Sequence, residues 1–115
     1  MQTAPFLFGG ELITEPVAPG VTRKIMGFNN QIMMAKVYFD EGSEGYIHSH
    51  FHSQVAYVES GEFDVTVGEE MNTLVAGDCF FMEPNISHGA ICKKAGVLID
   101  VFSPMREDFL AENNK

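Results

Sequence analysis

Residues 42–54 read GSEGYIHSHFHSQ, a stretch that holds three histidines and a glutamine within a few positions. In an extended strand, side chains two residues apart project to the same face, so His48 and His50 can direct their imidazoles to one point. Imidazole binds Zn, Fe, Ni, Mn and Cu, and the side-chain carbonyl of Gln54 can supply a neutral oxygen ligand beside it. His88 follows a turn and opens a later strand, where it can complete the set. The pattern predicts a site for one divalent metal ion.

The third histidine of this stretch, His52, has two interpretations. Strand parity alone places its side chain beside those of His48 and His50. A turn or bulge after His50 would redirect the ring. We expect His52 to lie next to the metal ligands or at the surface, and a further imidazole ligand is the alternative.

Short β-prone runs bounded by Gly, Pro, Asn and Asp dominate the chain, as is typical of an antiparallel sandwich or barrel. Residues 62–67 alternate between apolar and polar side chains, which predicts a half-buried strand. Residues 96–102 read GVLIDVF and are apolar on both faces apart from Asp100, which predicts a central strand or one covered by a partner subunit. Residues 104–112 are predicted to be helical. The predicted strands are residues 21–26, 31–39, 46–50, 53–59, 62–67, 71–75, 78–83, 88–92 and 96–102.

The composition indicates one folded domain with a restricted choice of partners. The chain has 115 residues, 45% of them hydrophobic, and a net charge of -9. This charge disfavours binding to nucleic acid and to anionic membranes, so a small anionic ligand would need a metal ion or an arginine. Cys79 and Cys92 are interpreted as two thiols without a disulfide. With no apolar run of membrane-spanning length and no leader sequence, we expect a cytoplasmic protein.

The histidine stretch also resembles the first cupin motif, over the interval from Gly42 to Gly61. Gln54 stands where that motif most often has Glu, which lowers the ligand charge by one. A looser version of the second cupin motif spans residues 77–88. The resemblance implies an all-β, single-domain cupin, a small double-stranded β-helix or jelly-roll barrel with a short C-terminal helix. It would occupy residues 1–115, with a metal-binding core at about 31–102.

Within the cupins, three runs resemble the small pectin degradation protein family, the KdgF-like proteins. They are HSHFHSQ from His48, PNISHG from Pro84 and DVFSPMREDFL from Asp100. The resemblance implies an isomerase-type enzyme that converts cyclic 4,5-unsaturated uronates, released by pectate or alginate lyases, into linear keto forms. It also implies a divalent transition metal, Ni, Fe, Mn or Zn, and a small anionic sugar acid as substrate.

By the same resemblance, Asp100, Phe102 and Arg106 are the expected catalytic residues. Asp100 and Phe102 lie two apart on one strand and therefore share a face. A carboxylate is costly to bury in an apolar strand unless it has a partner or a task, and a structural salt bridge or an outward position is the alternative. Arg106 offers a planar fork for a uronate carboxylate, and a solvated arginine at a helix terminus is the alternative.

Two other functions and the subunit arrangement stay open from the sequence. Cupins also include iron dioxygenases and non-catalytic proteins that bind a sugar or small acid. We expect a homodimer, because a small open barrel leaves strand edges exposed and residues 5–12 could supply a strand to a neighbour. Large apolar side chains that lie outside the site are expected in the core. These are Met33, Met34, Tyr46, Tyr57 and Phe81.

Overall fold

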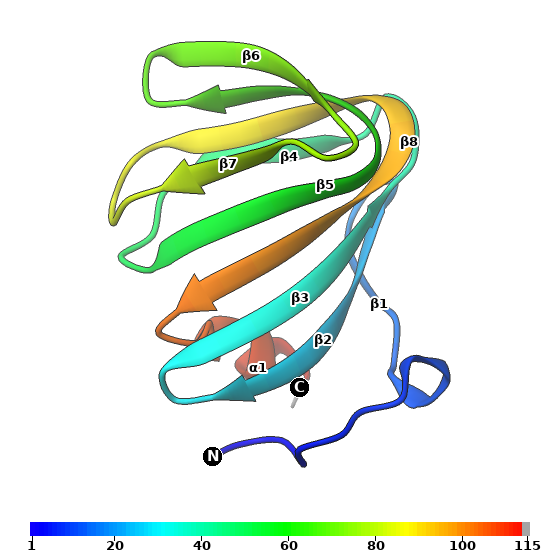
Figure 1. Ribbon diagram of the computed structural model, residues 1–115, viewed down its shortest axis with the longest axis vertical. Coiled ribbons are helices and arrows are strands. Elements are labelled where there is room, and N and C mark those ends of the chain that lie inside the picture. Colours follow the sequence, from blue (N-terminus) through cyan, green and yellow to red (C-terminus); the bar gives the residue numbers. More distant parts are fainter. Residues whose placement is uncertain (114–115) are drawn as a thin grey trace.

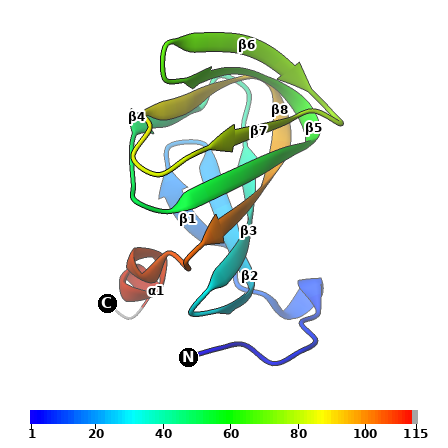
Figure 2. The same cartoon turned by 60° about the vertical axis from the view of Figure 1, so that its left-hand side comes forward.

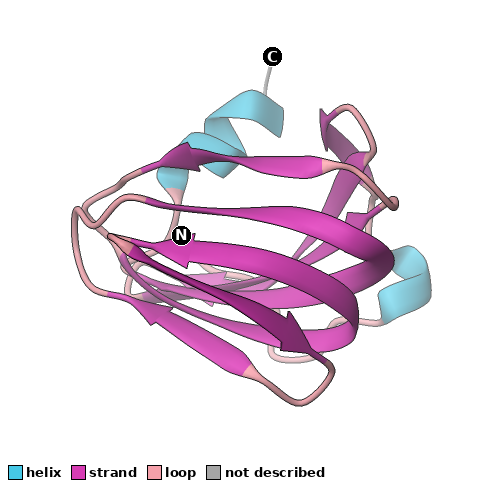
Figure 3. Ribbon diagram, turned by 90° about the horizontal axis from the view of Figure 1, so that it is seen from above, coloured by secondary structure: helices cyan, strands magenta, loops and turns pink. Residues whose placement is uncertain are grey.

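In the computed structural model, residues 1–113 are described, with side chains as far as Leu110. The predicted all-β fold with a short C-terminal helix is confirmed, and strands in two layers surround one interior (Figures 1 and 3). No helix in the described part of the chain is long and apolar enough to cross a lipid bilayer. The elements are the 3-10 helix Gly9–Glu11, β1 Glu15–Ala18, β2 Val21–Asn29, β3 Ile32–Phe39, β4 Glu44–His48, β5 Ser53–Val67, β6 Glu70–Val75, β7 Cys79–Met82, β8 His88–Ser103 and α1 Glu107–Asn113.

The two longest strands, β5 and β8, pair with each other and join the two layers. The first half of β5 pairs with β7 and its second half with β6, whereas β8 pairs first with β4 and then with β3. One layer therefore has the order β1-β2-β3-β8-β5-β7 and the other the order β4-β8-β5-β6. Figure 2 shows α1 following the end of β8 at the open end of the barrel. This topology brings residues from β4, β5 and β8 to one interior.

Two glycines allow β5 and β8 to bend together between the layers. The register shifts between Val58 and Phe63, where Gly61 has a positive φ of 85°. A Cβ at Gly96 would lie 2.1 Å from the carbonyl oxygen of Ser60. Only glycine permits so close an approach of the two backbones. The sequence predicted separate strands at 53–59 and 62–67, and at 88–92 and 96–102. Because of the bend, the first two segments form one continuous strand, β5, and the last two form another, β8.

The N-terminal region differs from the prediction in another way. Residues 5–12 contain the short 3-10 helix and no strand, whereas Glu15–Ala18 forms β1 and pairs with β2. Pro16 lies inside β1, and proline is a poor indicator of a strand except at a sheet edge. Edge position explains why this strand is tolerated and why the sequence did not indicate it.

The core contains the inward-facing side chains of both layers, including fully buried Phe63, Phe102 and Met33. The expectation of core positions was wrong for four residues. Met34, Tyr57 and Phe81 alternate with buried or half-buried neighbours and point outward, whereas Tyr46 lies on the largely exposed strand β4 and lines a cavity. The exposed ones are Met34, Tyr46, Tyr57 and Phe81, with relative exposures of 39%, 60%, 46% and 61%. The two cysteines are free thiols, as predicted.

Candidate metal centre and its cavity

Three imidazoles meet at the mouth of the barrel. His48 ends β4, His50 follows in the loop, and His88 begins β8 opposite His48 in the strand pairing. One nitrogen of each ring lies within 4.8 Å of those of the other two. The ring centroids of His48 and His88 are 4.4 Å apart, and those of His50 and His88 are 4.9 Å apart. The structure thus brings together the three histidines that the sequence singled out.

Backbone contacts at Nδ1 leave the Nε2 atoms of His48 and His88 free for a ligand. The Nδ1 atom of His48 lies 2.7 Å from the carbonyl oxygen of Tyr46, and that of His88 lies 3.0 Å from the oxygen of Ile86. When Nδ1 carries the proton and donates it, Nε2 keeps its lone pair. The Nε2 atom of His88 is buried without a hydrogen-bond partner among the described residues. An orphaned acceptor within an imidazole cluster fits a bound cation.

Gln54 connects the imidazoles to the interior of the barrel. Its Oε1 atom lies 2.9 Å from Nε2 of His50, and its amide nitrogen donates to Oδ1 of Asp100 at 3.1 Å. The carboxylate can only accept, so it holds the amide with the oxygen directed at the imidazoles. A neutral oxygen and three imidazoles form a donor set suited to Zn, Fe, Ni or Mn.

The local environment favours the neutral form of His50 and His88. Burial lowers the pKa of His88 to about 4. Burial and then the nearby charge of Arg106 lower the pKa of His50. Neutral imidazole is the form that binds a metal.

His52 lies outside the cluster and is buried rather than at the surface. Strand β4 ends at His48, so the alternation of side chains along a strand does not place the His52 ring beside the ligands. The ring stacks on Phe51 with a centroid distance of 4.0 Å, and its centroid is 5.3 Å from that of His50. Neither ring nitrogen of His52 has a hydrogen-bond partner among the described residues. The three-imidazole cluster does not include it.

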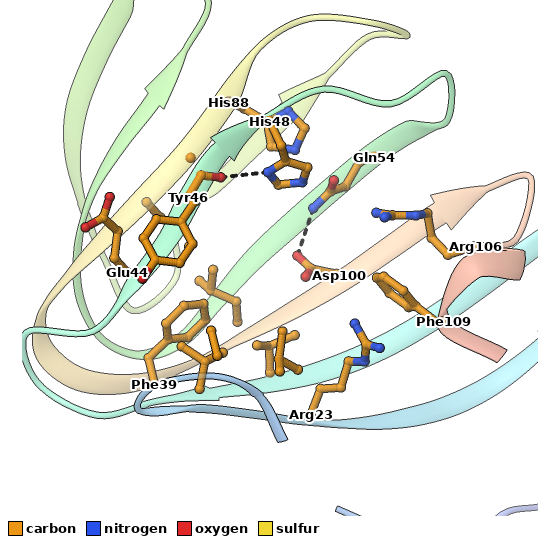
Figure 4. Close-up of a pocket in the computed structure, with 18 of the residues that line it drawn as sticks. Arg23, Phe39, Glu44, Tyr46, His48, Gln54, His88, Asp100, Arg106 and Phe109 are labelled. Atoms are coloured by element: carbon orange, nitrogen blue, oxygen red, sulfur yellow. Dashed lines mark hydrogen bonds between the residues drawn. The ribbon is translucent and has the colours of Figure 1, made fainter. Parts of the chain in front are cut away.

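A cavity of about 430 Å³ extends from the imidazoles into the barrel. Figure 4 shows His48 and His88 above Gln54, with Asp100 beneath it and Arg106 and Phe109 to one side. Asp100 lines this cavity and therefore points inward. Burial raises the pKa of Asp100 to about 6, whereas the hydrogen bond from Gln54 and the charge of Arg106 oppose the rise. The cavity thus contains a carboxyl group that is hydrogen-bonded to the candidate metal ligand Gln54.

Phe102 and Arg106 form the wall of the cavity next to α1. Phe102 is fully buried and its ring contacts that of His50 edge-on, at a centroid distance of 5.8 Å. The Arg106 side chain is 11% exposed, so it is not a solvated arginine at a helix terminus. It pairs with Asp108 through two hydrogen bonds of 3.0 and 2.8 Å.

Sequence reasoning missed Arg23 and Phe109. Arg23 is buried on β2, forms an ion pair with Glu15 of β1 and lies 3.6 Å from the centroid of the Phe109 ring. Both side chains line the cavity. The only sequence signal for Arg23 is its parity with Val21, which places a charged residue on the inner face of an otherwise ordinary strand.

Comparison with known proteins agrees with the fold. The family model for the cupin domain matches residues 35–102. The pectin degradation protein KdgF of Dickeya dadantii is 41% identical over 98 residues, which cover 84% of this chain and 89% of that protein. An RmlC-like cupin from Shewanella frigidimarina is 49% identical with a TM-score of 0.92, over 94% of this chain and 97% of that one. KdgF from a Halomonas species is 36% identical with a TM-score of 0.88, over 93% and 99%.

Proposed function

Because the chain belongs to the cupin family and is a relative of the pectin degradation protein KdgF, we propose that it is a metal-dependent isomerase in pectin or alginate breakdown. Its substrates would be cyclic 4,5-unsaturated monouronates and its products their linear keto forms. The observation that carries this proposal is the polar path from the imidazole cluster through Gln54 to Asp100, in a cavity that also contains two arginines. Such a cavity combines a site for a Lewis-acidic metal ion, a proton-transfer group and arginine side chains that can bind the carboxylate of an acidic sugar.

The proposed metal ligands are His48, His50, Gln54 and His88. A divalent ion bound there would act as a Lewis acid that stabilises negative charge on a substrate oxygen. Gln54 also acts on Asp100, since its amide donates to the carboxylate and fixes the position of that group. The candidate ligand Gln54 therefore also positions the Asp100 carboxylate.

The reaction requires two proton movements. The anomeric hydroxyl of the hemiacetal loses a proton and becomes the carbonyl of an aldehyde as the bond between carbon 1 and the ring oxygen breaks, and the ring oxygen takes up a proton to become an enol. The enol then loses its proton as carbon 4 gains one, which yields the ketone. Asp100 is the proposed proton-transfer group, because it lies in the cavity beside the candidate ligand Gln54.

Arg106 and Phe102 have binding roles in this proposal. An acidic chain repels an anionic sugar, so the guanidinium of Arg106 would supply the local positive charge that a uronate carboxylate needs. Phe102 would form an apolar wall for the sugar ring and exclude water there.

Proton NMR of the reaction in D₂O tests this function. Metal-loaded protein is mixed with the unsaturated monouronate from a pectate or alginate lyase digest. We expect the vinyl signal of carbon 4 to disappear faster than in a protein-free control, with one deuterium appearing at carbon 4 of a keto product. An unchanged vinyl signal, or an oxidised product, would exclude the isomerase activity.

We also propose that the chain is a cytoplasmic homodimer that pairs through one outer face of the barrel. The strand register places Phe81 of β7, Val55 of β5, Val101 of β8 and Met34 of β3 in one row across this face. Phe81, Val55 and Met34 are exposed. A continuous apolar row on an outer face is typical of a surface that another protein covers.

Charge favours a second copy of this chain as the partner. The outer face of the opposite layer is charged, with Asp64 and Lys93 paired at 3.8 Å on β5 and β8. The row's own layer also carries an ion pair beside the row, between Lys36 and Glu59 at 3.3 Å. The apolar row contains no charged side chain, although the chain carries a net charge of -9. Two acidic copies repel each other least when they meet on the uncharged row.

A further inference from the structure

The guanidinium of Arg106 is held along one edge and leaves another edge toward the cavity. Asp108 accepts hydrogen bonds from Nε at 3.0 Å and from Nη2 at 2.8 Å. A guanidinium has five N–H donors in a fixed plane, so this pairing leaves the two N–H groups of Nη1 and one of Nη2. Figure 4 shows the guanidinium directed into the cavity toward Gln54. The remaining edge can receive a second carboxylate without displacing Asp108.

Two aromatic rings further restrict the guanidinium. Its central carbon lies 4.3 Å from the ring centroid of Phe109 and 5.1 Å from that of Phe102. The Phe109 ring also contacts Arg23 and meets Phe102 edge-on at 5.5 Å. Contacts of an arginine with aromatic faces hold its planar group in a defined orientation. A guanidinium that is fixed in advance loses less conformational entropy when a ligand binds.

We infer that Asp108 and Phe109 are positioning residues, which hold Arg106 so that its free edge receives the carboxylate of an acidic sugar. The inference rests on the proposed function, because it specifies how the acid group of that substrate is recognised. Asp108 and Arg106 both line the cavity, but the Asp108 side chain is 54% exposed whereas that of Arg106 is 11% exposed. The carboxylate of Asp108 thus anchors the arginine at the solvent-exposed rim of the cavity.

A purely structural role for Asp108 makes a different prediction. Asp108 and Glu107 both lie in the first turn of α1, where a carboxylate stabilises the positive end of a helix. If Asp108 served only the helix, its loss would have the same effect as the loss of Glu107. Glu107→Gln is therefore the matched control, since it removes the same charge from the same turn.

Calorimetric titration of the metal-loaded full chain with galacturonate and with galactose separates these roles. The two sugars share a ring framework and differ in the carboxylate, and neither contains the reactive double bond. We expect Asp108→Asn to weaken galacturonate binding by roughly fivefold or more, through loss of the fixed Arg106, and to leave galactose binding unchanged. Phe109→Leu should act in the same direction, Asp108→Glu should restore part of the affinity, and Glu107→Gln should leave both affinities unchanged.

Three results would overturn the inference: no preference of the unmodified chain for galacturonate, equal weakening of both sugars by Asp108→Asn, or equal effects of Asp108→Asn and Glu107→Gln. Turnover of the unsaturated uronate distinguishes this failure from that of the proposed function. Acid selectivity that depends on Asp108 without turnover would leave the inference standing and remove the function. If the chain turns over the uronate but Asp108→Asn leaves KM and acid selectivity unchanged, the proposed function stands and the inference is removed.

Discussion

His88 has the most specific environment of the three clustered histidines. Its Nδ1 is satisfied by the Ile86 carbonyl, while its buried Nε2 has no partner among the described residues. We expect His88→Ala to lose the single bound metal equivalent, measured by elemental analysis after gel filtration in the presence of Ni²⁺ or Fe²⁺. His52→Ala should retain that equivalent, because the His52 ring lies outside the cluster. Equal metal content in the two variants would refute the ligand assignment.

Asp100 allows a test of proton transfer that leaves the metal in place. Replacement by Asn keeps the size of the side chain but removes the group that can accept and return a proton. We expect Asp100→Asn to lower turnover of the unsaturated uronate by at least about 100-fold while the metal content stays the same. Steady-state kinetics and elemental analysis of the same sample measure the two quantities. Full activity in a metal-loaded variant would remove Asp100 from the mechanism.

At the scale of residues, the sequence predicts those site side chains that are marked by a pattern of neighbouring residues. The candidate ligands His48 and His88 were found because strand and turn signals act within a few residues, whereas His50 lies beyond the end of β4 and reaches the cluster from the loop rather than by strand parity. Parity with Val21 is the only local signal for Arg23, and Phe109 has none, since the two residues are far apart in the chain and meet only when the barrel closes. Their contact with the cavity depends on long-range packing, which one sequence does not reveal.

At the scale of elements, the joint bend of β5 and β8 determines whether the cavity forms. A methyl group at Gly96 would lie 2.1 Å from the Ser60 oxygen and 2.6 Å from the Cα atom of Gly61, both of which belong to the backbone. We expect Gly96→Ala to lower the free energy of unfolding by at least about 2 kcal/mol, measured by urea denaturation. Gly10→Ala is the control, because nothing lies within 4 Å of the added methyl there. Similar unfolding midpoints for the two variants would contradict this account of the bend.

Strand existence could be predicted from the sequence better than strand continuity. The alternation at residues 62–67 and the apolar run at 96–102 correctly indicated strands, which pair with residues 88–94 and 54–60 respectively. Turn residues such as Gly61 suggested interruptions, whereas the structure uses them for bulges inside continuous strands. Local turn chemistry is the same in both cases, and only the pairing partner distinguishes them.

At the scale of the whole molecule, the apolar row defines where a second copy should bind. We expect Val55→Asp to convert a homodimer into a monomer, measured by light scattering coupled to gel filtration, because it places a charge in the row. Ile91→Asp is the matched control, because Ile91 is exposed to nearly the same extent, 46% against 44% for Val55, but pairs with Asp64 of the charged layer. A Val55→Asp dimer, or a monomer in the unmodified chain, would exclude this interface.

The central claim is that a metal ion held by the imidazole cluster drives ring opening of an unsaturated uronate. Its most direct test is the rate of loss of the ultraviolet absorbance of the conjugated double bond. The rate is measured for protein loaded with Ni, Fe, Mn or Zn, for chelated protein and for a protein-free control. The account predicts a decay faster than the control with at least one of these metals, which chelation and His50→Ala both abolish. A decay equal to the control with all four metals, or one that survives chelation, would contradict it.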